Sequence, residues 1–203
     1  LLECGYDRGE SSMALPPQAG QISKPDRYAV MGNPVAHSKS PAIHKLFAHQ
    51  FKHNIEYTAI EVESGGLAQA VEQFRAAGGK GLNITVPYKL DAFRLADNLS
   101  DRATLAEAVN TLKFEADGQI FGDNTDGAGI ARDIEINLNI PLRDKNILIL
   151  GAGGAVRGVL DPILRHRPAK IVIANRTVSK AKDLVRVFSA HGKVEAISFD
   201  DLK

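Results

Sequence analysis

The chain has 203 residues and a formal net charge of +1 at pH 7, with 44% hydrophobic and 24% charged residues. These values are ordinary for a soluble globular protein with one large or two small domains, and they exclude a broad basic surface for nucleic acid. A single cysteine, Cys4, excludes an internal disulfide framework and predicts a reducing, cytoplasmic location. No apolar run approaches membrane-spanning length, so no membrane partner is expected.

Residues 1–25 lack hydrophobic periodicity and contain Gly, Ser and Pro among scattered charges. They have no apolar central region, so they do not form a signal peptide. We expect a disordered or artificial tail here, with Met13 as a candidate natural start.

A strand at residues 27–31 is followed by a turn and then by a helix for which Ser40 is the expected N-cap and Pro41 the first residue. Its apolar stripe consists of Ile43, Leu46, Phe47 and Phe51. The other side carries His44, His49, Lys52 and His53. His49 and His53 lie one turn apart, but no carboxylate or cysteine completes a metal site, so we interpret this side as a solvated face and predict no metal.

Two hydroxyls, Ser38 and Ser40, precede this helix. Hydroxyl donors at the positive end of a helix dipole can hold a carboxylate. Plain N-capping is the alternative, and it explains one of the two serines.

The stretch GLNITVPYK at residues 81–89 predicts a strand that leads into a helix. Leu82, Ile84 and Val86 alternate onto one face, so Asn83 and Thr85 share the opposite face. Two polar residues on such a strand indicate a ligand-binding wall.

Pro87 is expected at the first position of the next helix, which places Lys89 in its first turn. The helix dipole disfavours an ammonium there, which suits a general acid or base. The sequence GDNTDG at 122–127 opens another helix, and Asp126 in its first turn is favoured as a carboxylate. Helix-start stabilisation alone would also explain Asp126, but a polar cluster between two domains is typical of a cleft.

The remaining elements of this half follow the same periodicities. They are a strand at 55–62, a helix at 66–77 that buries Leu67, Ala70, Val71 and Phe74 and ends at Gly78-Gly79, a helix at 101–108, a strand from 109, and a hairpin turn at Asp117-Gly118.

The second half begins with a run of apolar residues at 146–150, interpreted as a fully buried parallel strand. The glycine turn GAGGA at 151–155 and a run of helix formers follow, and this arrangement favours binding of a pyrophosphate. A tight turn without a ligand is the alternative, and Val156 stands where the usual fingerprint has a third small residue.

A second buried strand is predicted at 170–174, followed by Asn175-Arg176-Thr177 and by Lys180. An NAD site usually has an acidic residue here, whereas a guanidinium suits a 2′-phosphate. The sequence therefore predicts an NADP site.

Together the motifs resemble the shikimate dehydrogenase family over about residues 27–203, in order and in spacing. The motifs that carry the resemblance are Asn33-Pro34, HSKSP at 37–41, NITVPYK at 83–89, AVNT at 108–111, GDNTDG at 122–127, GAGGA at 151–155 and NRT at 175–177. The resemblance implies an α/β protein with an N-terminal substrate-binding domain at 26–125 and a Rossmann-like nucleotide-binding domain at 126–203. It also implies reversible NADPH-dependent reduction of 3-dehydroshikimate to shikimate, a step toward chorismate and the aromatic amino acids.

The same resemblance implies roles for single residues. Ser38 and Ser40 would bind the substrate carboxylate. Thr85, Asn110 and Asp126 would bind ring hydroxyls, with Asn83 supporting that wall. Lys89 would be the catalytic acid/base, paired with Asp126. The cofactor would contact Asp101, Gly151, Ala152, Gly153, Gly154, Ala155, Asn175, Arg176, Thr177 and Lys180.

The sequence departs from the family in one respect, because it ends near the third strand of the nucleotide domain, predicted at 193–198. A complete dinucleotide fold has two βαβαβ halves, so the domain is expected to be incomplete and the strand at 146–150 to lie at an open edge. We therefore expect this chain alone to be self-associated or poorly soluble and to have little activity. The alternatives are a quinate/shikimate dehydrogenase and a ligand-sensing relative without turnover, and the sequence predicts no oligomeric state.

Overall fold

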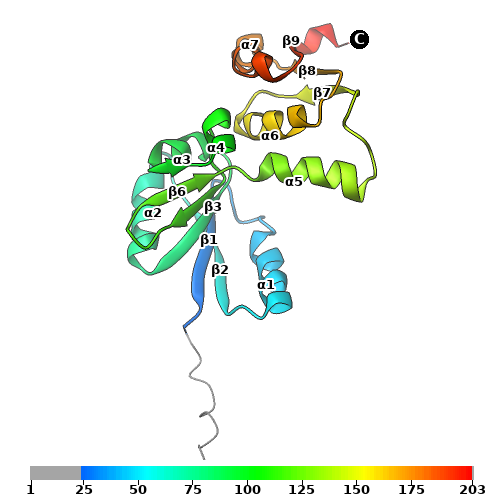
Figure 1. Cartoon of the computed structure of the whole chain (residues 1–203). Helices are drawn as coiled ribbons and strands as arrows, with labels where there is room; N and C mark the ends of the chain where they lie inside the picture. Colours follow the sequence, from blue (N-terminus) through cyan, green and yellow to red (C-terminus); the bar gives the residue numbers. More distant parts are fainter. Residues whose placement is uncertain (1–23, 203) are drawn as a thin grey trace, which may run out of the picture.

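The computed structural model describes residues 24–202, so the predicted tail lies almost entirely outside the described residues. Two separate sheets are present: one of six strands in the order β2-β1-β3-β5-β6-β4, and one of three in the order β7-β8-β9. Helix α5 (Asp126–Arg132) runs between the part that contains the first sheet and the part that contains the second (Figure 1). The domain boundary at 125/126 stays a prediction, and the change of sheet falls after β6.

The first sheet is mixed. Strands β1, β2 and β3 are parallel, β5 runs antiparallel to β3 and β6, and the short β4 pairs with β6. The strands are β1 (Asp26–Gly32), β2 (Ile55–Glu61), β3 (Gly79–Ile84), β4 (Asn98–Leu99), β5 (Thr111–Phe114) and β6 (Ile120–Asp123). The helices between them are α1 (Ser40–Phe51), α2 (Leu67–Ala76), α3 (Lys89–Leu95) and α4 (Asp101–Ala106).

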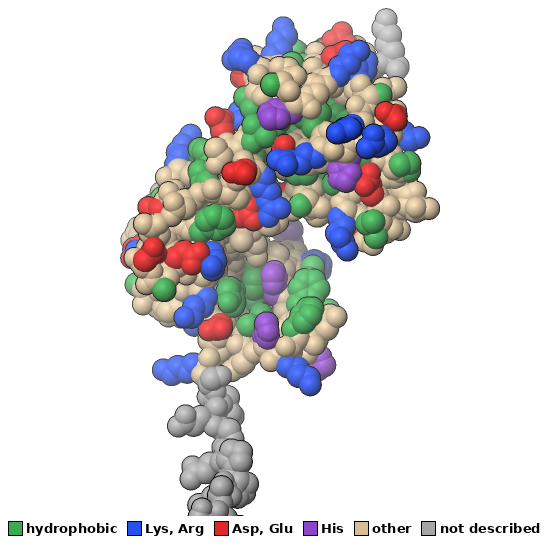
Figure 2. Space-filling model, in the orientation of Figure 1, with side chains coloured by type: hydrophobic (Ala, Val, Ile, Leu, Met, Phe, Trp, Pro, Cys, Tyr) green, Lys and Arg blue, Asp and Glu red, His purple; other side chains and the backbone are tan. Residues whose placement is uncertain are grey.

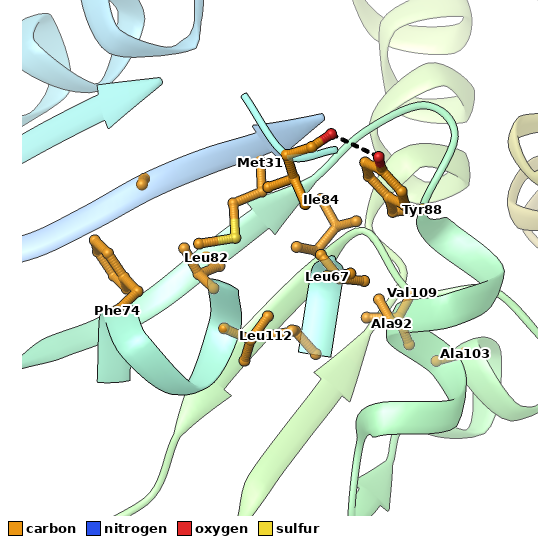
Figure 3. Close-up of a cluster of buried hydrophobic side chains, with 13 residues drawn as sticks. Met31, Leu67, Phe74, Leu82, Ile84, Tyr88, Ala92, Ala103, Val109 and Leu112 are labelled. Atoms are coloured by element: carbon orange, nitrogen blue, oxygen red, sulfur yellow. Dashed lines mark hydrogen bonds between the residues drawn. The ribbon is translucent and has the colours of Figure 1, made fainter. Parts of the chain in front are cut away.

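One face of this sheet buries the core of the substrate-side half (Figure 3). Leu82 and Ile84 of β3 point into it and meet Val71 and Phe74 of α2. The hydroxyl of buried Tyr88 donates to the carbonyl of Val62 at 2.6 Å, which satisfies the polar end of this side chain within the core. Because side chains alternate along a strand, Asn83 of β3 faces the other side of the sheet.

Helix α1 covers that other side but differs from the prediction. It begins at Ser40, with Lys39 in the cap position and no side-chain cap, so the predicted capping by Ser40 is wrong. No residue of α1 is buried, and the predicted apolar stripe is largely exposed, up to 70% at Leu46. Figure 2 shows this green surface beside histidines on the lower part of the molecule. His44, assigned to the solvated face, instead stacks on Tyr57 at 4.2 Å.

Three further details of the first half correct the sequence prediction. Val86 lies beyond the end of β3 and is exposed rather than on the core face. Pro87 precedes α3, whose cap is Tyr88 and whose first residue is Lys89. Helix α4 ends at Ala106 because Glu107 adopts a left-handed conformation with φ of 49°. These are errors of boundary, and they leave Lys89 in a first helical turn as predicted.

The second half is a parallel three-stranded βαβαβ unit. Its elements are β7 (Asn146–Leu150), α6 (Gly154–Arg165), β8 (Lys170–Ala174), α7 (Val178–Phe188) and β9 (Val194–Ile197). A π-helical turn (Asp133–Asn137) continues α5, and two 3₁₀ turns (Ser189–His191 and Phe199–Asp201) flank β9. Its core is formed by β8 together with one face of α6 and of α7.

Strand β7 lies at the edge of this sheet and pairs only with β8 among the described residues. The prediction of a fully buried strand is therefore wrong, since Leu148 is 52% and Leu150 64% exposed. Strand β8 has the expected burial, with Ile171, Ile173 and Ala174 inside. The expectation of an open edge at β7 agrees with this arrangement.

The two halves meet where α5 crosses α6. A Cβ on Gly127 would lie 2.3 Å from the carbonyl oxygen of Gly158, and a Cβ on Gly158 would lie 2.6 Å from the carboxamide of Asn124. Asn124 is 1% exposed, and its Nδ2 donates to the carbonyl of Ala108 at 2.9 Å. Glycine is thus required at the crossing because backbone and a fixed polar side chain occupy the space.

We predict that Gly158→Ala lowers the free energy of unfolding by about 1–3 kcal/mol, since the added methyl must displace Asn124 or separate the two helices. Urea denaturation measures this loss. Gly129→Ala is the matched control, because a Cβ at Gly129 of α5 meets nothing within 4 Å. It should be neutral or stabilising by up to about 1 kcal/mol through helix propensity. Equal effects of the two substitutions would contradict the proposed tight crossing.

Candidate active site

An ion pair joins the starts of two helices at the centre of the molecule. Lys89 is the first residue of α3 and Asp126 the first residue of α5, and the Lys89 Nζ contacts Asp126 Oδ2. The side chains are 12% and 29% exposed. The ion pair places a carboxylate beside the ammonium group in the first turn of α3. The structure therefore brings together the two residues predicted as the catalytic pair.

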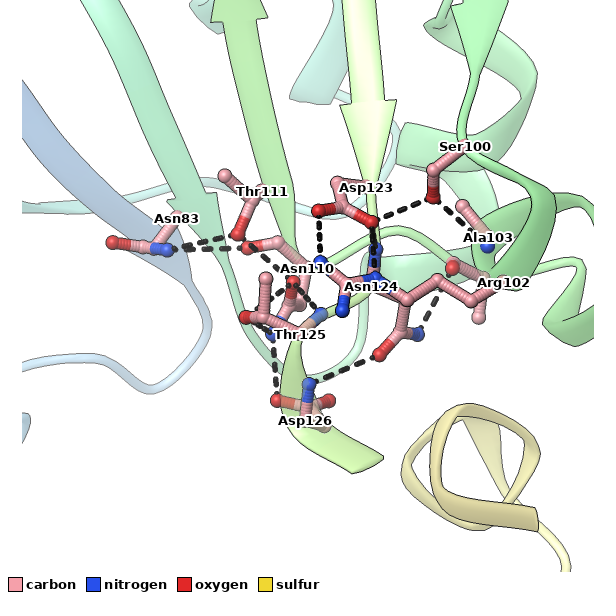
Figure 4. Close-up of polar contacts among 11 residues, drawn as sticks. Asn83, Ser100, Arg102, Ala103, Asn110, Thr111, Asp123, Asn124, Thr125 and Asp126 are labelled. Carbon is pink, nitrogen blue, oxygen red and sulfur yellow. Dashed lines mark hydrogen bonds and ion pairs between the residues drawn. The ribbon is translucent and has the colours of Figure 1, made fainter. Parts of the chain in front are cut away.

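The buried carboxamide of Asn110 holds Asp126 in place. Its Nδ2 donates to Asp126 Oδ1 at 2.6 Å and to Thr125 Oγ1 at 3.0 Å. Its Oδ1 accepts from the backbone N–H of Thr125 at 3.0 Å and from the hydroxyl of Thr111 at 2.9 Å. The carboxylate of Asp126 is thereby fixed between an amide and an ammonium. Figure 4 shows the contact with the amide.

Asn83 extends this set of contacts across the sheet. Its Nδ2 donates to Thr111 Oγ1 at 3.2 Å, and its Oδ1 accepts from the hydroxyl of Tyr57 at 2.6 Å. Both polar atoms of the Asn83 side chain are thus engaged within the protein. This fits a supporting role for Asn83 in the wall.

Ser38, Ser40 and Thr85 lie together at a separate cavity of the first half. Ser38, Ser40 and Thr85 line a cavity of about 350 Å³ together with Val35 and His37. The Ser38 Oγ accepts the backbone N–H of Ser40 at 3.3 Å, so Ser38 rather than Ser40 supplies a side-chain contact at the start of α1. Burial raises the pKa of Tyr57 and the side chain of Ser40 lowers it, so Ser40 lies near the Tyr57 hydroxyl.

The glycine turn lies against the ion pair. Gly151 has a φ of 108°, a conformation that favours glycine, and Gly153 caps α6. A Cβ on Gly154 would lie 3.5 Å from the Cβ of Lys89. Ala152 and Ala155 complete a turn with small side chains only. The N-terminus of α6 is therefore open to an anionic ligand beside Lys89.

The predicted adenosine end lies after β8. Arg176 and Lys180 are exposed and form no ion pair with any residue in 24–202. Asn175 donates from Nδ2 to the carbonyl of Thr177 at 2.8 Å, which shapes the turn into α7. Two cations without protein partners beside a glycine turn suit the pyrophosphate and 2′-phosphate of NADP.

Asp101 lies apart from this turn. It lines a cleft of about 660 Å³ with Asp161 and Arg165, and residues 151–155 are not part of the lining. The guanidinium of Arg165 is held by Asp161 at 2.8 Å and also feels the charge of Asp101. The structure does not bring Asp101 together with the other predicted cofactor residues.

Asp123 is a site-neighbouring residue that the sequence analysis did not single out. It precedes Asn124 at the end of β6, accepts from Ser100 Oγ at 2.6 Å and from Arg102 Nε at 2.7 Å, and pairs with a second nitrogen of Arg102. These donors, Arg102 first, lower the pKa of Asp123 to about 2. The contact fixes α4 to β6 directly beside the segment that carries Asp126.

Tyr57 and Thr111 were also missed, although both contact predicted site residues. Tyr57 lies in none of the motifs named above, and Thr111 ends the AVNT motif at 108–111 but was assigned no role, so only the alternation of β2 and β5 indicated their side of the sheet. Within residues 24–202 no three His, Cys, Asp or Glu side chains gather to hold a metal. No helix in the described part of the chain is long and apolar enough to cross a membrane.

A six-stranded α/β half and a parallel βαβαβ half with a glycine turn, meeting at a Lys–Asp pair, define a dehydrogenase-type α/β protein. Residues 30–112 match the shikimate dehydrogenase substrate binding domain, and residues 134–203 match the shikimate / quinate 5-dehydrogenase family. The chain belongs to the shikimate dehydrogenase family, and the predicted fold class is confirmed.

The chain is 55% identical over 178 residues to a shikimate dehydrogenase (NADP(+)) of Hahella chejuensis, covering 88% of this chain and 66% of the relative. It also resembles the crystal structure of an Ael1 enzyme from Pseudomonas putida, with 51% identity and a TM-score of 0.79 over 87% of this chain and 65% of that chain. A shikimate 5-dehydrogenase from Thermus thermophilus, solved with NADP(H) and shikimate, gives 33% identity and a TM-score of 0.75, covering 83% and 62%. The chain thus spans slightly less than two thirds of the length of these relatives.

The Asp123–Arg102 contact predicts a pH dependence of stability. A carboxyl group whose pKa is lower in the folded than in the unfolded state stabilises the fold above its unfolded pKa, and this contribution is lost as the pH falls toward about 2. Urea denaturation between about pH 4 and pH 2 should therefore show a steeper loss of stability for the unmodified chain than for Asp123→Asn. Asp91→Asn, which removes an exposed contact to Arg94, is the control and should keep the steep profile. Parallel profiles for Asp123→Asn and the unmodified chain would refute this assignment.

Proposed function

We propose that this chain carries the substrate-binding and adenosine-binding parts of an NADP-dependent shikimate dehydrogenase. The proposed reaction is the reversible reduction of 3-dehydroshikimate to shikimate. The observation that carries the proposal is the Lys89–Asp126 pair, held by Asn110 and lying against the glycine turn. The match to both family descriptions supports it.

The substrate is a carboxylic acid with ring hydroxyls, and the walls of the site suit both groups. Hydroxyls at Ser38 and Ser40, beside the start of α1, would donate to the carboxylate. Thr85 on the same cavity would bind a ring hydroxyl, and Asn110 would do so by exchanging one of its present contacts, such as that to Thr125 Oγ1, for the ligand. Binding at both ends would fix the reacting carbon near Lys89.

When bound, NADP supplies a hydride acceptor at its nicotinamide ring. In the oxidation direction, the Nζ of Lys89 would take the proton from the substrate hydroxyl, and the carboxylate of Asp126 would stabilise the ammonium that forms. In the reduction direction the ammonium would return the proton to the carbonyl oxygen. The short distance between Gly154 and Lys89 would place the cofactor end of the site next to this proton donor.

Arg176 and Lys180 favour NADP over NAD in this proposal, and the quinate/shikimate alternative with NAD is accordingly disfavoured. A ligand sensor would not need the proton-transfer pair, which the chain keeps. A small-molecule substrate is the expected partner. A cytoplasmic location remains a prediction.

The direct test is to measure binding of shikimate and of NADP to this chain by calorimetry and to assay turnover on the same sample. Binding of both ligands is expected. Failure to bind either one would overturn the proposal for this chain, and binding without turnover would separate the recognition of ligands from the chemical step.

In a version extended to the length of the curated relatives, Lys89→Ala should lower kcat by roughly 10²-fold or more, with a smaller change in shikimate affinity, because it removes the group that transfers the proton. Steady-state kinetics of shikimate oxidation measure both quantities. Arg94→Ala, an exposed cation on the same helix, is the control. A kcat near that of the unmodified enzyme would make Lys89 a structural residue.

Arg176→Ala should remove most of the preference for NADP over NAD. The loss of a charge-assisted contact to the 2′-phosphate is expected to cost about 1.5–3 kcal/mol of NADP affinity and little NAD affinity. Calorimetric titration of the chain with both nucleotides measures this. Arg186→Ala on the exposed side of α7 should leave both affinities unchanged. Equal affinities of the unmodified chain for NAD and NADP would sink the prediction.

A further inference from the structure

Tyr57 of β2 lies between two parts of the proposed substrate site. Its ring stacks on His44 of α1, with centroids 4.2 Å apart and planes 5° apart. Its hydroxyl donates to Asn83 Oδ1 at 2.6 Å and lies near the side chain of Ser40. Tyr57 therefore lies between the serine end of the site and the asparagine wall.

The contact continues from Asn83 toward the ion pair. Asn83 Nδ2 donates to the hydroxyl of Thr111, which donates to Asn110 Oδ1, and Asn110 Nδ2 donates to Asp126. Figure 4 shows the part of this series from Asn83 to Asp126. Each hydroxyl and carboxamide along it accepts on one side and donates on the other.

This arrangement has a single direction. A carboxamide offers donors on nitrogen and acceptors on oxygen, so its orientation is set by what its neighbours require. With the Tyr57 O–H directed at Asn83 Oδ1, the nitrogen of Asn83 must face Thr111, which leaves the Thr111 proton for Asn110 Oδ1. The nitrogen of Asn110 then faces the carboxylate of Asp126. Reversing Asn110 would put its carbonyl against the carboxylate of Asp126 and its NH₂ group against the backbone N–H of Thr125, whereas the orientation of Asn83 follows from the Tyr57 O–H that is directed at its oxygen.

We infer that Tyr57 is a positioning residue of this site, which orients the Asn83 side chain and, through Thr111, supports the orientation that Asn110 takes toward the carboxylate paired with Lys89. The identity of the ligand in this inference rests on the proposed function. The series of hydrogen bonds from Tyr57 to Asp126 does not depend on it. Tyr57 would act from outside the site, by fixing Asn83 before the acid binds.

Two properties of Tyr57 suit this role. Burial raises the pKa of Tyr57 to about 12, so its hydroxyl keeps the donor proton at any ordinary pH. Stacking on His44 fixes the plane of the ring independently of the hydroxyl. Tyr57→Phe therefore removes the hydrogen bond to Asn83 and keeps the stacking on His44.

The matched control is Tyr28→Phe. Tyr28 pairs directly with Tyr57 in the register of β1 and β2 and lies on the same face of the sheet, but its hydroxyl has no hydrogen-bond partner among residues 24–202. Both substitutions remove one hydroxyl from neighbouring strands. Only the loss at Tyr57 interrupts the series.

Two measurements on the 203-residue chain test the inference. In the ligand-free state, Tyr57→Phe should shift the side-chain NH₂ resonances of Asn83 and of the more distant Asn110, whereas Tyr28→Phe should leave the Asn110 signals in place. With shikimate as the probe, Tyr57→Phe should weaken binding by about tenfold, the order expected for the loss of a buried hydrogen bond, and Tyr28→Phe should not. Thr111→Val should reproduce both effects, and Thr111→Ser, which keeps a hydroxyl, should recover most of the affinity.

The outcomes are distinct. Unchanged Asn110 resonances in Tyr57→Phe, or shikimate affinity equal to that of Tyr28→Phe, would overturn the inference. Absence of shikimate binding by the unmodified chain would count against the proposed function instead, and the resonances of the ligand-free protein would still decide whether Tyr57 orients Asn110. If Tyr57→Phe fails to fold, the Thr111→Val and Thr111→Ser pair gives the same decision.

Discussion

The buried carboxamide of Asn110 is the group on which the arrangement of the site depends. It lies between the first sheet and the segment that leads from that sheet to α5. It forms hydrogen bonds with the hydroxyl of Thr111 in β5, with the backbone N–H of Thr125 and with the carboxylate of Asp126. A buried amide that lost one of these partners would pay the full desolvation cost of the orphaned atom. All four hydrogen-bonding positions of the Asn110 carboxamide are engaged, so the position of the Asp126 carboxylate is fixed. Lys89 forms its ion pair with the carboxylate in that position. The order of the site is thus enforced by hydrogen-bond satisfaction more than by packing.

The crossing of α5 and α6 extends that constraint to the nucleotide side. Asn124 is pinned to the carbonyl of Ala108, and Gly158 leaves room for it. An ion pair between Arg157 of α6 and Glu107 at the end of α4, at 2.7 Å, closes the same junction at its surface. The distance between Gly154 and Lys89 follows from this close approach. The position of the glycine turn relative to the Lys89–Asp126 pair therefore depends on Gly127 and Gly158, which leave room for the close crossing.

Much of this could be predicted from the sequence, because period-two and glycine signals act locally. The strands, the glycine turn, the hairpin at Asp117-Gly118 and the first-turn positions of Lys89 and Asp126 all follow from short-range rules. Some errors are local, such as the cap of α1 and the end of α4, and the larger ones depend on distant neighbours. The stripe of α1 and the leucines of β7 are exposed. An apolar pattern thus identifies the face of an element that burial would stabilise, but it does not show whether another element packs against that face. Tyr57 could not be found because its role comes from a hydrogen bond to Asn83 on another strand, which no spacing within β2 encodes.

Residues 123–126, from the end of β6 to the start of α5, make three separate contacts with different parts of the protein. Asp123 turns toward Arg102 and Ser100 and fixes α4, Asn124 turns inward to the α6 crossing, and Asp126 turns toward Lys89. Each neighbour uses a different direction from the backbone, so each polar group is satisfied without competing for the same donor. Asn124 also accepts a hydrogen bond from the backbone N–H of Asp126 at 3.3 Å, so the crossing of α5 and α6 is connected to the residue that carries the carboxylate. A shift of α6 would consequently be felt first at Asn124 and then at Asp126. The joint between the halves and the chemistry of the site are therefore parts of one hydrogen-bonded structure.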